Sequence, residues 1–345
     1  MTATICKTSE NEATGLVRRI NRVGSWRSRS GVFPSADGEP RHRIPRLCGR
    51  LERRPSLACL ATILAVVFST SSFSGETVKT EIIEKIDQNN YPKSLNACGP
   101  TCLLMQFQNG TPEMRAAHKK LIGSDSTKRL NFVIDRYFKT KRSVISPELY
   151  RWGINGVLTR DMEAAADDWM EENRLDLLDL SGSWLDRENV EEKNSEMVRR
   201  IHRMMKRSLE AGVPPILSLK SFVAREKLNK PGEMEWRIGQ HHYVLITEIP
   251  DSLIRGDEAT KTVSSQGFKL GIIDPNGGME SEIFVFHDSN GQPFTAQKGN
   301  GTQGKWISGK PFLQVAAPTV PTLKPANLKW SERVVTIANH LMGKF

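Results

Sequence analysis

The chain has 345 residues, of which 26% are charged and 38% hydrophobic, and its formal net charge is +10. Residues 1–74 contain 12 Lys/Arg and 5 Asp/Glu, so seven of the ten excess positive charges lie there and only three in the remainder. Because no basic stripe interleaved with aromatic residues follows residue 74, composition and charge exclude a dedicated nucleic-acid-binding protein. We therefore expect no nucleic-acid partner.

The N-terminal part has the organisation of an exported protein. Residues 1–55 are rich in Arg, Ser, Gly and Pro and lack apolar periodicity, which predicts a disordered basic leader. An apolar run at 57–68 follows a pair of arginines and precedes a serine cluster, which is typical of the h- and c-regions of a signal peptide over 56–74. The run is too short for an ordinary spanning helix. We expect cleavage near Ser74, a secreted or periplasmic protein and no stable membrane span.

The part that follows the predicted signal peptide is long enough for one sizeable core. We divide it into a domain over 75–315 and a linker with a C-terminal helix over 316–345. Of the five cysteines in the chain, only Cys98 and Cys102 lie in this part, which is too few for a disulfide scaffold.

The spacing of apolar residues predicts helices in the first half of this part and strands in the second. The predicted helices cover residues 98–107, a segment that begins after Thr111, 129–137, 159–169 and 194–211. The predicted strands cover residues 213–222, 243–249, 267–273 and 282–286. A long loop at 288–309, an extended linker at 318–325 and an amphipathic helix over 327–342 complete the chain. Helices followed by strands with short turns predict an α+β architecture with an antiparallel sheet.

The stretch Cys98-Gly99-Pro100-Thr101 is the most informative in the chain. It predicts a turn that places a thiol in the first turn of a buried helix, because proline suits the first helical positions. Free backbone N–H groups and the positive end of the helix dipole would lie beside the sulfur and favour the nucleophilic thiolate. A lone cysteine is also compatible with a buried structural role.

Two further blocks downstream supply a base and an acid. His241 and His242 stand at the head of the strand predicted at 243–249, and Asp274 stands where another strand gives way to a Pro-Asn-Gly-Gly turn. A nucleophile, a base and a group that orients the base are the three parts of covalent cysteine catalysis. Neighbours on a strand point to opposite faces, so only one histidine can face the cysteine, and His241 remains an alternative to His242. Asp274 is also compatible with an ordinary turn.

These blocks, Cys-Gly-Pro-Thr-Cys-Leu-Leu-Met, His-His-Tyr-Val-Leu-Ile and Ile-Ile-Asp-Pro-Asn-Gly-Gly, resemble the three motifs of papain-like cysteine peptidases. Within that group the chain is most similar to the double-glycine leader (bacteriocin-processing) peptidase-like family. The resemblance implies a papain-like cysteine peptidase fold of the α+β class, with N-terminal helices, including the nucleophile helix, packed on a C-terminal antiparallel sheet.

The same resemblance implies an activity and its residues. It makes Cys98 the nucleophile, His242 the general base and Asp274 the orienting group of a cysteine peptidase that acts on a peptide or protein without cofactor or metal. His242 follows Cys98 by 144 residues, within the spacing of about 130–150 typical of papain-type enzymes.

The chain departs from the family pattern at two positions. Cys102 stands where serine is usual, and Pro92 stands six residues before the cysteine, where the family has its oxyanion-hole glutamine. The nearest glutamine is Gln88, which we take as the candidate second oxyanion donor beside the backbone N–H of Cys98.

Three other hypotheses remain open at this point. Cys98, Cys102, His241 and His242 together have the composition of a Cys₂His₂ zinc site. The fold is also compatible with a catalytically silent binding module, and the same triad with amidase or transglutaminase-type acyl transfer. We find no spanning helices and no nucleotide-binding motif, so leader cleavage coupled to export is not implied.

Overall fold

The computed structural model describes residues 77–91, 96–153, 156–175, 178–186, 188–189, 191–227, 229–253, 267–287, 312–317, 320 and 333–345. All of them belong to one compact unit, Thr70–Phe345. The leader predicted over 1–55, the signal peptide predicted over 56–74 and the loop predicted over 288–309 lie outside the described residues.

The described residues contain five α-helices, and these confirm five of the six helices predicted from the sequence. They are α1 (Cys98–Gln108), α2 (Pro112–Lys119), α3 (Ser126–Val133), α4 (Thr159–Asn173) and α5 (Asn194–Glu210). A short 3₁₀ turn, η1 (Gln88–Asn90), precedes α1, and a π-helical segment, η2 (Ile134–Lys139), continues α3. The Thr111 side chain accepts a hydrogen bond from the Met114 N–H, so it caps α2 as its sequence position indicates.

The strands of the described residues form one antiparallel sheet. They are β1 (Thr77–Lys79), β2 (Ser181–Trp184), β3 (Ile216–Lys227), β4 (Lys230–Pro250), β5 (Gly267–Asp274), β6 (Met279–Phe286), β7 (Leu313–Ala316) and β8 (Arg333–Gly343). Four of them, β3 to β6, confirm the four strands predicted from the sequence.

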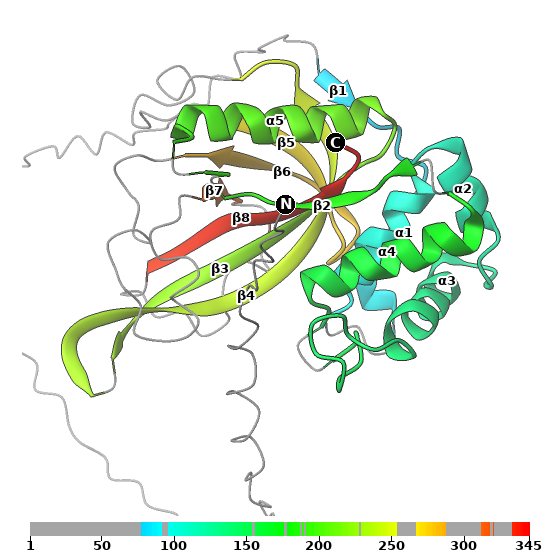
Figure 1. Cartoon of the computed structure of the whole chain (residues 1–345), viewed down its shortest axis with the longest axis horizontal. Coiled ribbons are helices and arrows are strands. Elements are labelled where there is room, and N and C mark those ends of the chain that lie inside the picture. The colour runs from blue at the N-terminus through cyan, green and yellow to red at the C-terminus, as the bar shows by residue number, and fades with distance from the viewer. Residues whose placement is uncertain are drawn as a thin grey trace, which may run out of the picture. The chain divides into compact units, whose positions relative to one another are not determined.

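The sheet closes on itself into a six-stranded antiparallel β-barrel (Figure 1). The strands run in the order β4-β3-β8-β7-β6-β5, and β5 pairs again with β4 through Leu245 opposite Ile273 and Ile246 opposite Ile272. Strands β1 and β2 lie outside this ring, where β1 pairs with β4 and β2 with β8. Every strand of the ring therefore pairs with two other strands of the ring.

The predicted fold class was wrong. We expected the α+β papain-like fold, with helices packed on an antiparallel sheet, whereas the sheet is a closed barrel accompanied by five helices within the described residues. The helix predicted over 327–342 was also wrong, because residues 333–343 form β8. This strand pairs with both β3 and β7 and so completes the ring. Its β-branched residues Val334, Val335 and Ile337 favour a strand.

Irregular pairing explains how the sheet curves enough to close. The register shifts between Ser218 and Leu219 on β3, again farther along β3, and between Ile246 and Glu248 on β4. Such bulges bend a strand and increase its twist. They interrupt the simple alternation from which strands are predicted, so the sequence pattern indicated strands but not their closure.

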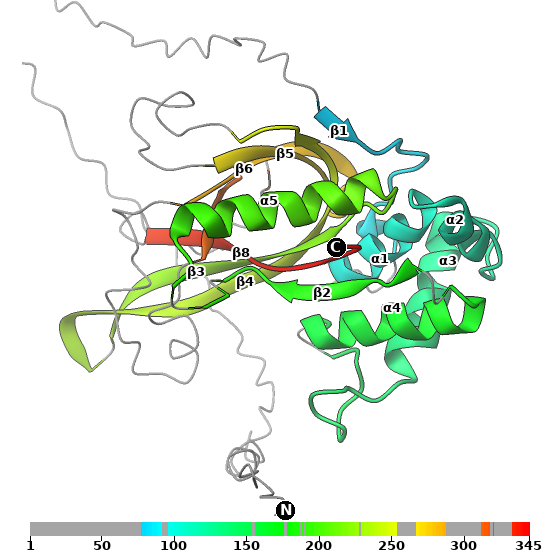
Figure 2. The same cartoon turned by 45° about the horizontal axis from the view of Figure 1, so that its top comes forward.

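Strand β4 contributes to two separate hydrophobic cores through its alternating side chains. Tyr243 and Leu245 pack in the cluster that contains α1 to α4, whereas Val244 and Ile246 pack in the cluster that contains the apolar stripe of α5. Accordingly, α1 to α4 gather at one end of the barrel and α5 lies along its side (Figure 2). The position of α1 relative to β4 is therefore fixed by the first of these cores.

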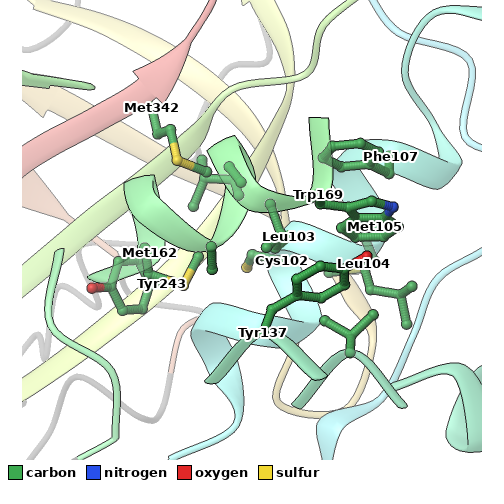
Figure 3. Packing of buried hydrophobic residues seen from close by; sticks show 14 of the residues in the cluster. Cys102, Leu103, Leu104, Met105, Phe107, Tyr137, Met162, Trp169, Tyr243 and Met342 are labelled. Atoms are coloured by element: carbon green, nitrogen blue, oxygen red, sulfur yellow. The ribbon is translucent and has the colours of Figure 1, made fainter. Parts of the chain in front are cut away.

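Stacked aromatic rings hold the helical core together (Figure 3). The rings of Phe107 on α1 and Trp169 on α4 are parallel, with centroids 3.9 Å apart and an interplanar angle of 3°. Tyr137 on η2 stacks on Trp169 from 5.6 Å. Trp169 is fully buried, so this one side chain joins three helical segments.

Truncation of this side chain should destabilise the fold strongly. We expect Trp169→Ala to lower the free energy of unfolding by about 3–5 kcal/mol, because it removes a large buried side chain and leaves a cavity. Urea denaturation followed by circular dichroism measures the loss. Trp184→Ala is the control, since Trp184 is 39% exposed, and it should be much less destabilising. Equal losses would contradict the assignment of Trp169 as the centre of the helical core.

Candidate active site

Helix α1 begins at Cys98, so the thiol lies in the first turn of a buried helix. Asn96 has a positive φ of 70°, a left-handed conformation that asparagine tolerates better than most residues. The next residue, Ala97, is the N-cap and has no side chain that can cap the helix. The first N–H groups of a helix have no partner within it. The backbone N–H of Cys98 therefore stands at the positive end of α1.

Gly99 allows the start of α1 to lie directly against β4. A Cβ atom at Gly99 would come within 2.8 Å of the Met162 sulfur and 3.3 Å of the Tyr243 ring. The ring cannot move aside easily, because the Tyr243 hydroxyl donates a hydrogen bond of 3.1 Å to the Val157 carbonyl. The absence of a side chain at Gly99 thus brings Cys98 close to the neighbouring residue of β4, His242.

Cys98, His242 and Asp274 form a connected series of side chains. His242 Nε2 lies 2.7 Å from Asp274 Oδ1, and the Cys98 thiol lies near enough to the imidazole to raise its pKa. Because Nε2 is used by Asp274, Nδ1 is the ring nitrogen that remains for the thiol. The exposed fractions are 8% for Cys98, 4% for His242 and 1% for Asp274. The three residues that the sequence singled out are therefore brought together, with the cysteine nearest to solvent.

The surroundings of His242 favour its protonated form. Burial alone lowers its pKa, but the interactions of the imidazole with Asp274 and Cys98 outweigh burial and raise the pKa to about 9. Below that pH the imidazolium lies beside the buried Asp274 side chain on one face and the Cys98 sulfur on the other. A general base in this reaction must first hold a proton and then transfer it, and this arrangement suits that role.

Cys102 has a different environment, although it lies one helical turn from Cys98. It is fully buried, and burial, together with the neighbouring Cys98 and Asp274, raises its pKa well above that of an ordinary thiol. Both cysteines are free. Cys102 thus remains a protonated thiol that packs beneath the site.

His241 points away from Cys98. Its Nε2 lies 2.8 Å from the Ser218 hydroxyl, and burial, together with the positive charges of Lys220 and the neighbouring histidines, lowers its pKa to about 3. The structure therefore joins His242, not His241, to the other two residues. The ligand set of the zinc hypothesis is not assembled, and among the described residues no group of three or more His, Cys, Asp or Glu is arranged to hold a metal ion.

Gln88 lies against the turn that follows Asp274. Its backbone N–H donates a 2.8 Å hydrogen bond to the Pro275 carbonyl. Its side chain is buried, and the amide oxygen has no hydrogen-bond partner within the described residues. Pro92, which occupies the position of the family's glutamine, lies outside the described residues.

The residues that connect this segment to the site were not predicted from the sequence. Asp87 Oδ1 accepts hydrogen bonds of 2.9 Å from the N–H groups of both Asn89 and Gly277. The Asn89 side chain donates to the Asn276 side chain over 2.9 Å. The pattern Asp-x-Asn signals a local turn, but the contact with residues almost 190 positions away has no local signal.

Comparison with protein-family models, with curated proteins and with solved structures gave no match to this chain. Within the part of the chain that the structure describes, no helix is both long enough and apolar enough to cross a membrane.

The raised pKa of His242 predicts a loss of stability at alkaline pH. A group whose pKa is higher in the folded state stabilises the fold fully below its unfolded pKa of about 6.5. That contribution is lost as the pH rises through the folded pKa of about 9. We expect the free energy of unfolding to fall by up to about 3 kcal/mol between pH 6 and pH 9.5, measured by urea denaturation.

Two variants show whether this loss belongs to the His242–Asp274 pair. Asp274→Asn should remove most of the pH dependence, because the partner that raises the pKa is gone. His241→Ala should retain it, because His241 is neutral throughout this range in the folded state. A wild-type protein of constant stability from pH 6 to pH 9.5 would contradict the charged pair.

Proposed function

We propose that this chain is a thiol hydrolase, specifically a cysteine peptidase, that cleaves an amide bond through a thioester on Cys98. The observation that carries the proposal is the connected series from the Cys98 thiol through the His242 imidazole to the Asp274 carboxylate. Asp274 uses one ring nitrogen of the histidine, which leaves the other for the nucleophile. This is the arrangement by which a base activates a thiol and is itself oriented.

Each step of the reaction has a residue to perform it. The Cys98 thiolate attacks the carbonyl carbon, a C–S bond forms, and the His242 imidazolium gives its proton to the leaving amine as the C–N bond breaks. Neutral His242 then takes a proton from water, whose oxygen attacks the thioester. The acid product leaves, and the sulfur and the imidazolium are restored. Asp274 holds the imidazole in one tautomer and stabilises its charged form.

Two donors would stabilise the negative oxygen of the tetrahedral intermediates. The backbone N–H of Cys98 stands at the start of α1, where helix geometry leaves it without a partner. The side-chain amide of Gln88 is the second donor, since its segment packs beside the turn that carries Asp274. Removal of one oxyanion donor typically lowers the rate by about 10²–10³.

The proposal does not depend on the papain-like fold, which is wrong for this chain. It rests on the side chains of the site and on the three sequence blocks that contain them. We further propose that the substrate is a peptide or protein met outside the cytoplasm, as the segment 56–74 indicates. Amidase or transglutaminase-type acyl transfer would use the same three residues, and a silent binding module would use none of them chemically.

The test is turnover of two substrates by the purified protein. Fluorescently labelled casein reports peptide-bond cleavage, and p-nitrophenyl acetate reports acyl transfer to and from the thiol. We expect Cys98→Ala and His242→Ala to reduce both rates to background, because each removes a reacting group. Asp274→Asn should reduce both rates substantially, because asparagine would hold the His242 imidazole in the wrong tautomer.

Two matched variants serve as controls, one for each neighbouring candidate. Cys102→Ser and His241→Ala should retain turnover, because neither side chain reaches the reacting atoms. Release of p-nitrophenolate at the wild-type rate by Cys98→Ala would refute the nucleophile. Acetate ester cleavage without casein cleavage would favour the amidase or acyl-transfer alternative, and the absence of both activities would favour the binding module.

A further inference from the structure

A set of hydrogen bonds fastens η1 to the turn at residues 275–278, which joins β5 to β6. The backbone N–H of Gln88 donates to the Pro275 carbonyl over 2.8 Å, and the Asn89 side chain donates to the Asn276 side chain over 2.9 Å. The Asn276 N–H in turn donates to Asp274 Oδ1 over 2.9 Å, and this is the carboxylate oxygen that contacts His242. The segment that carries Gln88 is therefore connected to the triad through a single turn.

The Asp87 side chain forms hydrogen bonds with both η1 and the turn at residues 275–278. Its Oδ1 accepts from the Asn89 N–H, which caps η1, and from the Gly277 N–H in the turn, each over 2.9 Å. Gly277 and Gly278 have positive φ angles of 98° and 61°, which glycine adopts without strain. A Cβ atom at Gly278 would lie 3.3 Å from the Asp87 nitrogen, so the missing side chain lets the two segments meet.

We infer that Asp87 is a positioning residue, which holds the Gln88 amide in place relative to the turn of Asp274 and so completes the oxyanion site. The inference rests on the proposed function, because it identifies the residue that positions the second oxyanion donor. A three-residue 3₁₀ turn such as η1 has little stability of its own. A carboxylate that accepts two N–H groups forms strong, directed hydrogen bonds. Its loss would free η1 from the turn, and a misplacement of about 1 Å can lower a rate about 10²-fold.

Two reagents separate this role from a general structural one. Acylation by p-nitrophenyl acetate passes through an oxyanion, whereas alkylation of Cys98 by iodoacetamide does not. We expect Asp87→Ala to slow p-nitrophenyl acetate turnover by about 10–100-fold, part of the effect of losing an oxyanion donor. Its rate of Cys98 alkylation, read by mass spectrometry, should stay within about twofold of wild type. Asp87→Asn retains an oxygen acceptor and should restore most of the turnover.

A double variant and a matched control complete the design. Adding Asp87→Ala to Gln88→Ala should cause no further loss, because a residue that acts through Gln88 has no effect once the amide is gone. Asp125 caps α3 in the same manner, by accepting from the Lys128 N–H over 2.9 Å, and lies outside the site. Asp125→Ala should leave both reactions unchanged.

Three results would overturn the inference: wild-type turnover in Asp87→Ala, equal slowing of both reagents, or fully additive losses in the double variant. If Cys98→Ala turns over p-nitrophenyl acetate as fast as wild type, the proposed function itself fails and the positioning role with it. That result concerns the nucleophile and is thus distinct from the three that concern Asp87.

Discussion

The pairing of β5 with β4 is the constraint on which both the barrel and the site depend. It closes the ring of six strands, and it brings Asp274, the last residue of β5, beside His242 on β4. Burial of a carboxylate and an imidazolium is unfavourable unless their charges and hydrogen bonds compensate each other. Here Asp274 Oδ1 accepts from both His242 and the Asn276 N–H. The strand pairing that closes the barrel thus also brings the residues of the site together.

The nucleophile reaches this pair through the packing of a helix on the same strand. Alternation along β4 directs Tyr243 and Leu245 into the core of α1 to α4, and Val244 and Ile246 into the core of α5. The first core, with Trp169 stacked between Phe107 and Tyr137, fixes α1 against the barrel. Gly99 then permits the close approach at the start of α1. Strand β4 consequently contributes both to the stability of the fold and to the geometry of the site.

Local features of the sequence predicted local features of the structure. The Gly-Pro pair after Cys98 predicted a helix start, apolar spacing predicted the five helices and four of the eight strands of the described residues, and the three blocks singled out residues that lie together. Contacts that join distant segments were not predictable in this way. The helix expected over 327–342 is strand β8 instead, because pairing with β3 and β7 decides the structure of this segment. The bonds of Asp87 and Gln88 to the turn of Asp274 likewise have no local signature.

The coupling of Cys98, His242 and Asp274 is tested most directly by titration of His242 by nuclear magnetic resonance, followed at its Cε1 proton in the wild type and in Cys98→Ala. We expect a midpoint of about 9 in the wild type, because Asp274 and Cys98 both stabilise the imidazolium. In Cys98→Ala the midpoint should fall, because one of these partners is removed. A wild-type midpoint at or below the ordinary value of about 6.5, or one that does not change in Cys98→Ala, would contradict the coupling of the three side chains.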